Sequence, residues 1–91
     1  METAVRCVVA GKVQRVRYRL STQEKAQGLG LEGWVKNLDT GEVELIARGK
    51  LEDVQALVDW LSFGPPMAEV EKVDVDPINT LEPFDGFKII Q

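Results

Sequence analysis

Residues 31 to 48 read LEGWVKNLDTGEVELIAR, which predicts two strands joined by a tight turn. Apolar and β-branched residues are frequent in segments 31–38 and 42–48, as is typical of strands. Between them, Asp39, Thr40 and Gly41 are the residue types that form hairpin turns. The stretch therefore predicts a β-hairpin near the middle of the chain.

A strand and a helix are predicted before this hairpin. Residues 4–10 read AVRCVVA and are rich in β-branched and apolar residues, which predicts a first strand. Two consecutive valines place that strand at a central position in a sheet, where both faces are covered. A helix is predicted over residues 21–29, because Ser21 as N-cap and Glu24 three residues later form a capping-box pattern.

A second helix and further strands are predicted after the hairpin. Apolar residues recur at helical spacing at Leu51, Val54, Leu57, Val58 and Leu61. The sequence GPP at 64–66 prevents the helix from continuing. Residues 70–75 alternate as a strand does, and residues 84–90 suggest a short closing strand. The order β-α-β-β-α-β plus a terminal strand predicts an α+β, ferredoxin-like sandwich, with two helices covering one face of an antiparallel sheet.

The size and composition exclude several classes of function. We expect one domain over residues 1–91, a monomer, and a cytoplasmic location, because no apolar run is long enough for a membrane span and METAVRC does not resemble a signal peptide. The chain has no histidine, which excludes histidine-based triads and ordinary zinc sites. Its carboxylates are scattered, so no metal site is predicted. Cys7 lies in the apolar run VRCVV and is predicted to be a buried strand thiol.

Positive charge is concentrated at the N-terminal end of an acidic protein. Residues 1 to 19 carry five basic residues and one acidic residue, a charge of +4, so residues 20 to 91 carry −8. An acidic body disfavours nucleic acid and anionic membranes as partners, whereas a small positive region on it can bind one compact anion. RNA-binding domains of this fold class also need aromatic residues on their central strands, and VRCVVA and EVELIAR contain none.

Four of the basic residues lie in GKVQRVRYR, residues 11–19, between the first predicted strand and the first predicted helix. A loop that leads into a helix N-terminus can direct unpaired N–H groups at an anion, and Arg19 would add a planar donor. A solvated basic turn is the alternative interpretation of the loop taken alone.

The whole pattern resembles the acylphosphatase family. In the family signature a glycine, a basic residue, Val-Gln, a glycine, Val, a small residue and an aromatic residue lead to an arginine, and GKVQRVRYR resembles that order at all positions except 15 and 17. The resemblance continues through STQEKAQGLGL, GWVKNLDTGEVEL, the helix ending in DWL, the GPP break and EVEKVDV. It covers residues 5 to about 76 in the correct order.

The resemblance implies a metal-free hydrolase without a cofactor that splits acyl phosphates into a carboxylate and inorganic phosphate. Its partners would be an acyl phosphate or inorganic phosphate. Arg19 would bind the phosphoryl group, and Asn37 would position the attacking water. The implied phosphate-binding loop consists of Gln14, Arg15, Val16, Arg17, Tyr18 and Arg19.

Physical chemistry is consistent with this assignment. Preorganised donors lower the barrier to phosphoryl transfer, and a carboxylate leaves without needing a proton from a general acid. The absence of histidine is therefore compatible with the reaction. Among the other conspicuous residues, Trp34 and Trp60 are expected to pack in or near the core, Tyr18 to anchor the loop, and Gln14 to shape it through its amide.

Two positions depart from the family signature. Arg15 stands where the family normally has glycine, and Arg17 where it has glycine or another small residue. A left-handed residue with a Cβ costs about 1–2 kcal/mol, so we hypothesise a protein that binds phosphate but turns over more slowly. The alternative is a catalytically impaired module that binds phosphate or a phosphometabolite.

Overall fold

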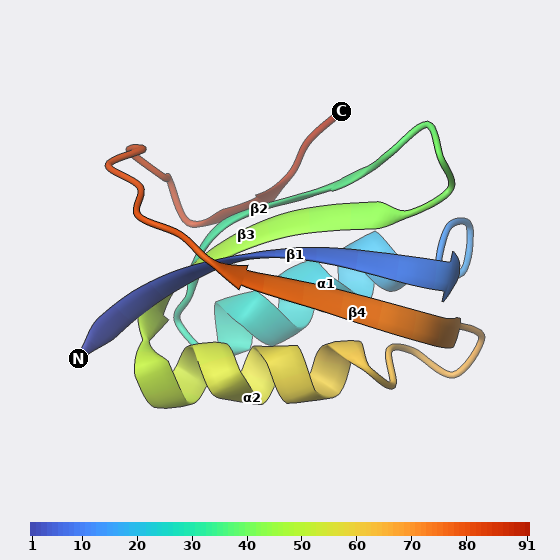
Figure 1. The fold of residues 1–91 in the computed structure, drawn as a ribbon, viewed down its shortest axis with the longest axis horizontal. Helices are drawn as coiled ribbons and strands as arrows, with labels where there is room; N and C mark the ends of the chain where they lie inside the picture. Colours follow the sequence, from blue (N-terminus) through green and yellow to red (C-terminus); the bar gives the residue numbers. More distant parts are fainter.

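The computed structural model describes all 91 residues, which form five strands and two helices. Figure 1 shows these elements, which are β1 (Glu2–Lys12), α1 (Tyr18–Gly28), β2 (Glu32–Asn37), β3 (Val43–Lys50), α2 (Leu51–Leu61), β4 (Glu69–Pro77) and β5 (Phe87–Ile89). The order confirms the predicted β-α-β-β-α-β arrangement with a terminal strand. The predicted hairpin is β2 and β3, which pair antiparallel from Glu32 opposite Arg48 to Asn37 opposite Val43.

The strands form one sheet in the order β4-β1-β3-β2-β5. The predicted central position of the first strand is confirmed, because β1 pairs with β4 on one side and β3 on the other. The expectation of a wholly antiparallel sheet was wrong at one edge, where β5 pairs parallel to β2. The chain returns to that edge through the long connection between β4 and β5, which lets the terminal strand enter in the same direction as β2.

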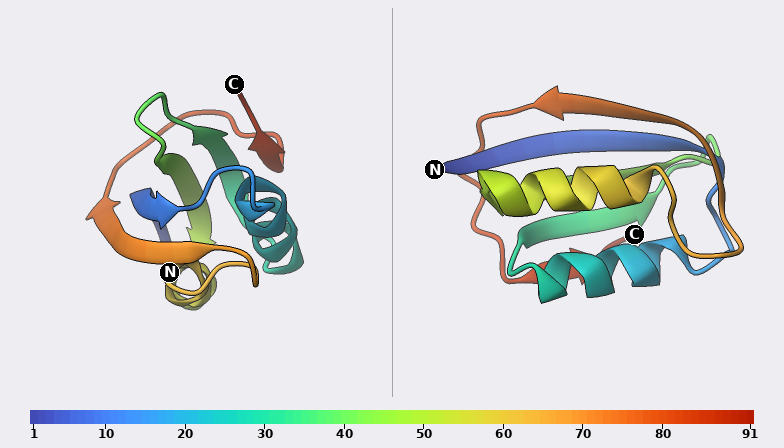
Figure 2. Two further views of the ribbon diagram at one scale, coloured as in Figure 1. Left: turned by 90° about the vertical axis from the view of Figure 1, so that its right-hand side faces the viewer. Right: turned by 90° about the horizontal axis from the view of Figure 1, so that it is seen from below.

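Both helices cover one face of this sheet, as predicted, and the core lies between the two layers (Figure 2). Alternate β1 residues Val5, Cys7 and Val9 point into that core, where Leu57 and Leu61 of α2 meet them. The amphipathic spacing of α2 explains this packing, because its apolar residues recur on one side of the helix. Neither helix, at 11 residues each, has the length and apolar character needed to cross a membrane.

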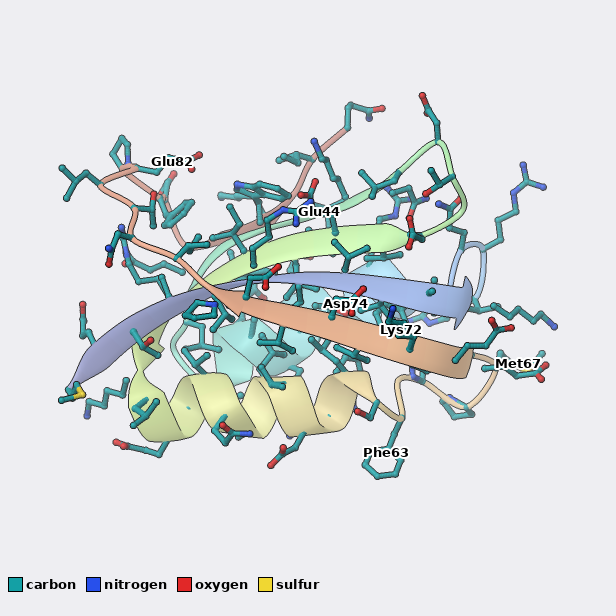
Figure 3. All side chains as sticks on the ribbon, viewed as in Figure 1. Glu44, Phe63, Met67, Lys72, Asp74 and Glu82 are labelled. Carbon is teal, nitrogen blue, oxygen red and sulfur yellow. The ribbon has the colours of Figure 1, made fainter.

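The opposite face of the sheet is charged. Arg6 and Lys36 both form salt bridges with Glu44, and Lys72 forms one with Asp74 (Figure 3). A solvated, charged sheet face of this kind needs no second layer to cover it.

The first helix starts three residues earlier than predicted. Arg17 is its N-cap, and the Arg17 carbonyl accepts the first helical hydrogen bond from the Ser21 N–H at 2.9 Å. Ser21 is therefore inside the helix and not its cap, because the preceding loop curls tightly enough to start the helix itself. This places Arg19 in the first turn of α1, where it is held by helical backbone.

The single cysteine and the two tryptophans lie as predicted. Cys7 is fully buried, and burial raises the pKa of its thiol from 9.0 to about 12, with Asp76 adding to the effect. Trp60 packs beside the ring of Tyr18, with the ring centroids 5.8 Å apart. Trp34 is partly buried, and the Lys36 ammonium lies 5.3 Å from its ring centroid.

Candidate active site

The loop between β1 and α1 lies at one end of the sheet, beside the connection from α2 to β4 (Figure 2). Gly11 makes the end of β1 possible. Its φ is +126°, and a Cβ there would lie 2.2 Å from the carbonyl oxygen of Glu69 in β4. Only glycine permits both this backbone conformation and this close approach of the two strands.

The loop contains two left-handed residues that are not glycine. Arg15 has φ 63° and Arg17 has φ 66°. The left-handed turn expected where the family has glycine is therefore present at Arg15 despite its side chain. The two departures from the family signature cost conformational energy, while the backbone keeps the conformation that glycine would give.

The backbone of this loop has a row of free donors. None of the N–H groups of residues 14 to 20 donates a hydrogen bond to a backbone or side-chain acceptor of the protein. Three of these residues, Tyr18, Arg19 and Leu20, form the first turn of α1, where the helix dipole places about half a positive charge. Unpaired N–H groups of this kind form an anion-binding site.

Two buried side chains fix the loop to the core. Val16 is buried, and Tyr18 donates a 2.7 Å hydrogen bond from its hydroxyl to the carbonyl of Leu61 at the end of α2. Burial raises the pKa of the Tyr18 hydroxyl, so it remains a neutral donor at physiological pH. Gly64 closes against the same ring, because a Cβ at Gly64 would lie 2.6 Å from it. The prediction that Tyr18 anchors the loop is confirmed.

Gln14 joins the loop to the β2–β3 turn. Its side-chain amide nitrogen donates to the carbonyl of Leu38 at 2.8 Å and to that of Glu42 at 2.9 Å. Asn37 immediately precedes this turn at the end of β2. The predicted role of the Gln14 amide in shaping the loop is thus extended, because it also fixes the loop relative to Asn37.

A cavity of about 160 Å³ opens beside the loop. It brings together five of the residues predicted for the site, namely Arg15, Arg17, Tyr18, Arg19 and Asn37. Gln14 and Val16 do not line it, because their side chains form the anchors described above. Val13, Leu20 and Ile89 complete the wall and were not predicted.

Ile89 had no sequence signal that could have placed it there. It reaches the site because β5 pairs parallel to β2, with Ile89 opposite Val35, two residues before Asn37. Val13 and Leu20 flank the predicted loop, so only their contact with the cavity was missed.

Arg19 and Asn37 have polar groups without protein partners. The Arg19 guanidinium is half-buried and takes part in none of the protein's salt bridges or side-chain hydrogen bonds. The Asn37 Oδ1 atom is buried and accepts no hydrogen bond. Buried polar atoms are nearly always paired, so this unpaired acceptor, on a residue that lines the cavity, indicates a partner that the protein itself does not supply, such as a ligand or a water.

A second, larger cavity of about 560 Å³ shares Arg19 and Asn37 with the first. Its other lining residues are Gln14, Leu38, Asp39, Ile90 and Gln91. The two unpartnered side chains therefore lie where the two cavities meet. Three arginines line the first cavity, whereas the second has one arginine and one aspartate.

Comparison with known proteins identifies the family. The acylphosphatase family model matches residues 5–89. An acylphosphatase of Acaryochloris marina is 51% identical over 87 residues, which cover 96% of this chain and 92% of the relative.

Two solved structures share the fold. The acylphosphatase of Coxiella burnetii is 43% identical with a TM-score of 0.92, and the match covers 98% of this chain and 93% of that one. The acylphosphatase of Bacillus subtilis is 35% identical with a TM-score of 0.93 and full coverage of both chains. On the family model and these relatives, the chain belongs to the acylphosphatase family.

Proposed function

We propose that the protein is an acylphosphatase, with one acylphosphatase-like domain over residues 1–91, in which Arg19 and the N–H groups of residues 14 to 20 bind the phosphoryl group. Asn37 positions the water that attacks phosphorus. In this reaction the water oxygen forms a bond to phosphorus, the bond from phosphorus to the acyl oxygen breaks, and the electron pair leaves with the carboxylate. One water proton is released, and the products are a carboxylate and inorganic phosphate.

Binding of the phosphoryl group follows from the donors of the loop. Charge in the transition state of phosphoryl transfer lies on the peripheral oxygens, so donors that already point at them lower the barrier. Seven N–H groups without a protein acceptor and the Arg19 fork are available as donors to these oxygens, and the N-terminus of α1 adds favourable potential. The cavity is smaller than the roughly 300–1,000 Å³ pockets that enclose drug-sized ligands, which suits a compact anion.

The role of Asn37 follows from its unpaired oxygen. A water that donates a hydrogen bond to Oδ1 has a lone pair on its oxygen that faces away from the asparagine and can attack phosphorus. Asn37 lines the same cavity as Arg19. A neutral amide does this without placing a negative charge near the phosphoryl group. A carboxylate at this position would repel the substrate.

The leaving group explains why the site works without a strong general acid. A carboxylate has a low proton affinity, since its conjugate acid has a pKa near 4. The tyrosine in the wall is no candidate for that task, because its hydroxyl already donates to Leu61. Stabilisation by fixed donors therefore accounts for the reaction.

The observation that carries this proposal is the pairing of the free Arg19 guanidinium with the buried, unpaired Asn37 oxygen at one cavity. Its test is the hydrolysis of benzoyl phosphate by Arg19→Ala and Asn37→Ala. We expect each variant to lower kcat/KM by about 10²- to 10³-fold. Inorganic phosphate should bind weakly to Arg19→Ala and almost normally to Asn37→Ala, because only the arginine contacts the anion.

Two controls make the test specific. Lys25→Ala removes an exposed cation from the same helix, and Asn79→Ala removes an exposed asparagine outside both cavities. Both should keep wild-type kinetics. Activity that survives Arg19→Ala would exclude the proposed phosphoryl site.

The rival function, a phosphate-binding module that has lost catalysis, rests on Arg15 and Arg17. Their left-handed φ angles favour the active enzyme, because the loop keeps its shape with both side chains present. Phosphate binding without any turnover of benzoyl phosphate in the wild type would select the rival.

A further inference from the structure

We infer that Arg15 and Arg17 make this protein prefer acyl phosphates whose acyl part carries a second anionic group, a carboxylate or a phosphate monoester. The inference rests on the proposed function, because it takes the phosphoryl group to lie beside Arg19. It adds a determinant of substrate choice, which the phosphoryl-binding donors cannot supply because every acyl phosphate shares the same phosphoryl group.

The first observation is a cluster of unneutralised charge. Three arginines, Arg15, Arg17 and Arg19, line the small cavity, and no acidic residue lines it. None of the three forms a salt bridge, although the chain has 15 acidic residues and a net charge of −4. In an acidic protein, three neighbouring guanidiniums without carboxylate partners repel one another unless an anionic ligand is present.

The second observation is that this charge exceeds what one phosphoryl group needs. A phosphoryl group carries about −1.5 to −2 near neutral pH. Arg19, the free N–H groups of residues 14 to 20 and the helix N-terminus already supply donors and positive potential for it. Arg15 and Arg17 are therefore available to a different group of the same substrate.

The third observation concerns position. An acyl part that extends from the phosphoryl group toward solvent leaves the cavity at its rim. Arg15 and Arg17 are exposed there, while Arg19 is half-buried. Their guanidiniums add positive potential at this rim, which attracts a carboxylate or a phosphate monoester across solvent.

The neighbouring cavity of about 560 Å³ has a different charge, which favours one path for an anionic acyl group. It is lined by Asp39 and, apart from the shared Arg19, by no basic residue. An anionic acyl group is repelled from that side and attracted to the side of Arg15 and Arg17. A neutral acyl group has no such bias, so the charge of the acyl group decides the preference.

The test compares two substrates of nearly equal shape, benzoyl phosphate and para-carboxybenzoyl phosphate. The measured quantity is the ratio of their kcat/KM values, with the carboxylated substrate as numerator. A guanidinium about 8 Å from the added carboxylate in a water-like dielectric changes this ratio about twofold. We expect Arg15→Gln and Arg17→Gln each to lower the ratio about twofold, and the double variant to lower it about fourfold.

Three further measurements separate local recognition from other effects. Arg15→Lys and Arg17→Lys keep the charge and should keep most of the ratio. Lys12→Gln removes a basic residue that precedes the loop and does not line the cavity, and it should change the ratio less than either arginine variant. Added salt should lower the wild-type ratio toward that of the double variant.

The inference is overturned if the double variant keeps the wild-type ratio, or if Lys12→Gln lowers it as much as Arg17→Gln does. The same assays with Arg19→Ala show which claim has failed. If both substrates depend on Arg19 and the ratio ignores Arg15 and Arg17, only this inference fails. If neither substrate depends on Arg19, the proposed function fails as well.

Discussion

Replacing Arg15 with glycine should stabilise this protein. Arg15 has φ 63°, in the left-handed region that residues with a Cβ rarely adopt. Its side chain is exposed and forms no salt bridge, so no folded-state contact opposes the change. A glycine at this position would adopt the same backbone conformation without the steric cost.

The expected gain in the free energy of unfolding is the difference between a steric cost that is removed and a conformational entropy that is added. A residue with a Cβ in the left-handed region costs about 1–2 kcal/mol. Glycine offsets about 0.5–1 kcal/mol of this gain, because its greater freedom stabilises the unfolded chain. The net gain is about 0.5–1 kcal/mol, which for a domain of this size raises Tm by about 2–8 °C.

The assay is urea and thermal unfolding of wild type, Arg15→Gly and Arg15→Gln. Both variants lose the same charge, so their difference isolates the backbone effect from the relief of repulsion among the arginines. The explanation predicts that Arg15→Gly is the most stable of the three and that Arg15→Gln gains much less. Equal stability of the two variants would refute the idea that the loop stores conformational strain at Arg15.

The same variant decides the hypothesis of slower turnover. If the side chain of Arg15 misplaces the loop, Arg15→Gly should raise kcat on benzoyl phosphate. The left-handed backbone already seen at Arg15 favours a gain in stability without that gain in kcat.

Three other predictions concern the framework that holds the site. Gly33→Ala should lower the free energy of unfolding by more than about 3 kcal/mol, because a Cβ would lie 1.8 Å from a carbonyl oxygen of β3. Gly41→Ala has open space around it and should cost about 1 kcal/mol, so equal losses in urea titrations would contradict this difference. Tyr18→Phe leaves the Leu61 carbonyl unpaired and should lower the free energy of unfolding by about 1–2 kcal/mol in the same assay. An unchanged urea midpoint would show that this hydrogen bond does not stabilise the fold. The pKa of the Cys7 thiol is about 12 in the folded protein, compared with an ordinary value of 9.0. The unfolded chain therefore loses this proton first, and the free energy of unfolding should fall as pH rises from 9.0 to about 12. A parallel fall in Cys7→Ala would exclude the thiol as the cause.

Much of the fold could be predicted because its strongest patterns are local. The hairpin around Asp39 to Gly41 and the apolar spacing of α2 depend on neighbouring residues, and both are present. The start of α1 was misplaced because Ser21 and Glu24 mimic a cap, while the true N-cap, Arg17, takes a conformation that its residue type does not favour.

The site residues likewise fall into those that a local sequence motif predicts and those that depend on the tertiary structure. The loop and Arg19 could be found from the motif, and Asn37 from its distance to that motif, because these residues have fixed spacing in the chain. Ile89 could not be found, since it reaches the cavity only through the parallel pairing of β5 with β2. The unpaired Asn37 oxygen is likewise a property of packing.

In the proposed mechanism, water beside Asn37 attacks the phosphorus held at Arg19. Hydrolysis of benzoyl phosphate by the wild-type protein in water enriched in heavy oxygen tests it most directly, with mass spectrometry of both products. We predict that the heavy oxygen enters inorganic phosphate and that the benzoate carries none. Heavy oxygen in the benzoate would mean that water attacks the carbonyl carbon, which would contradict the assignment of the phosphoryl site.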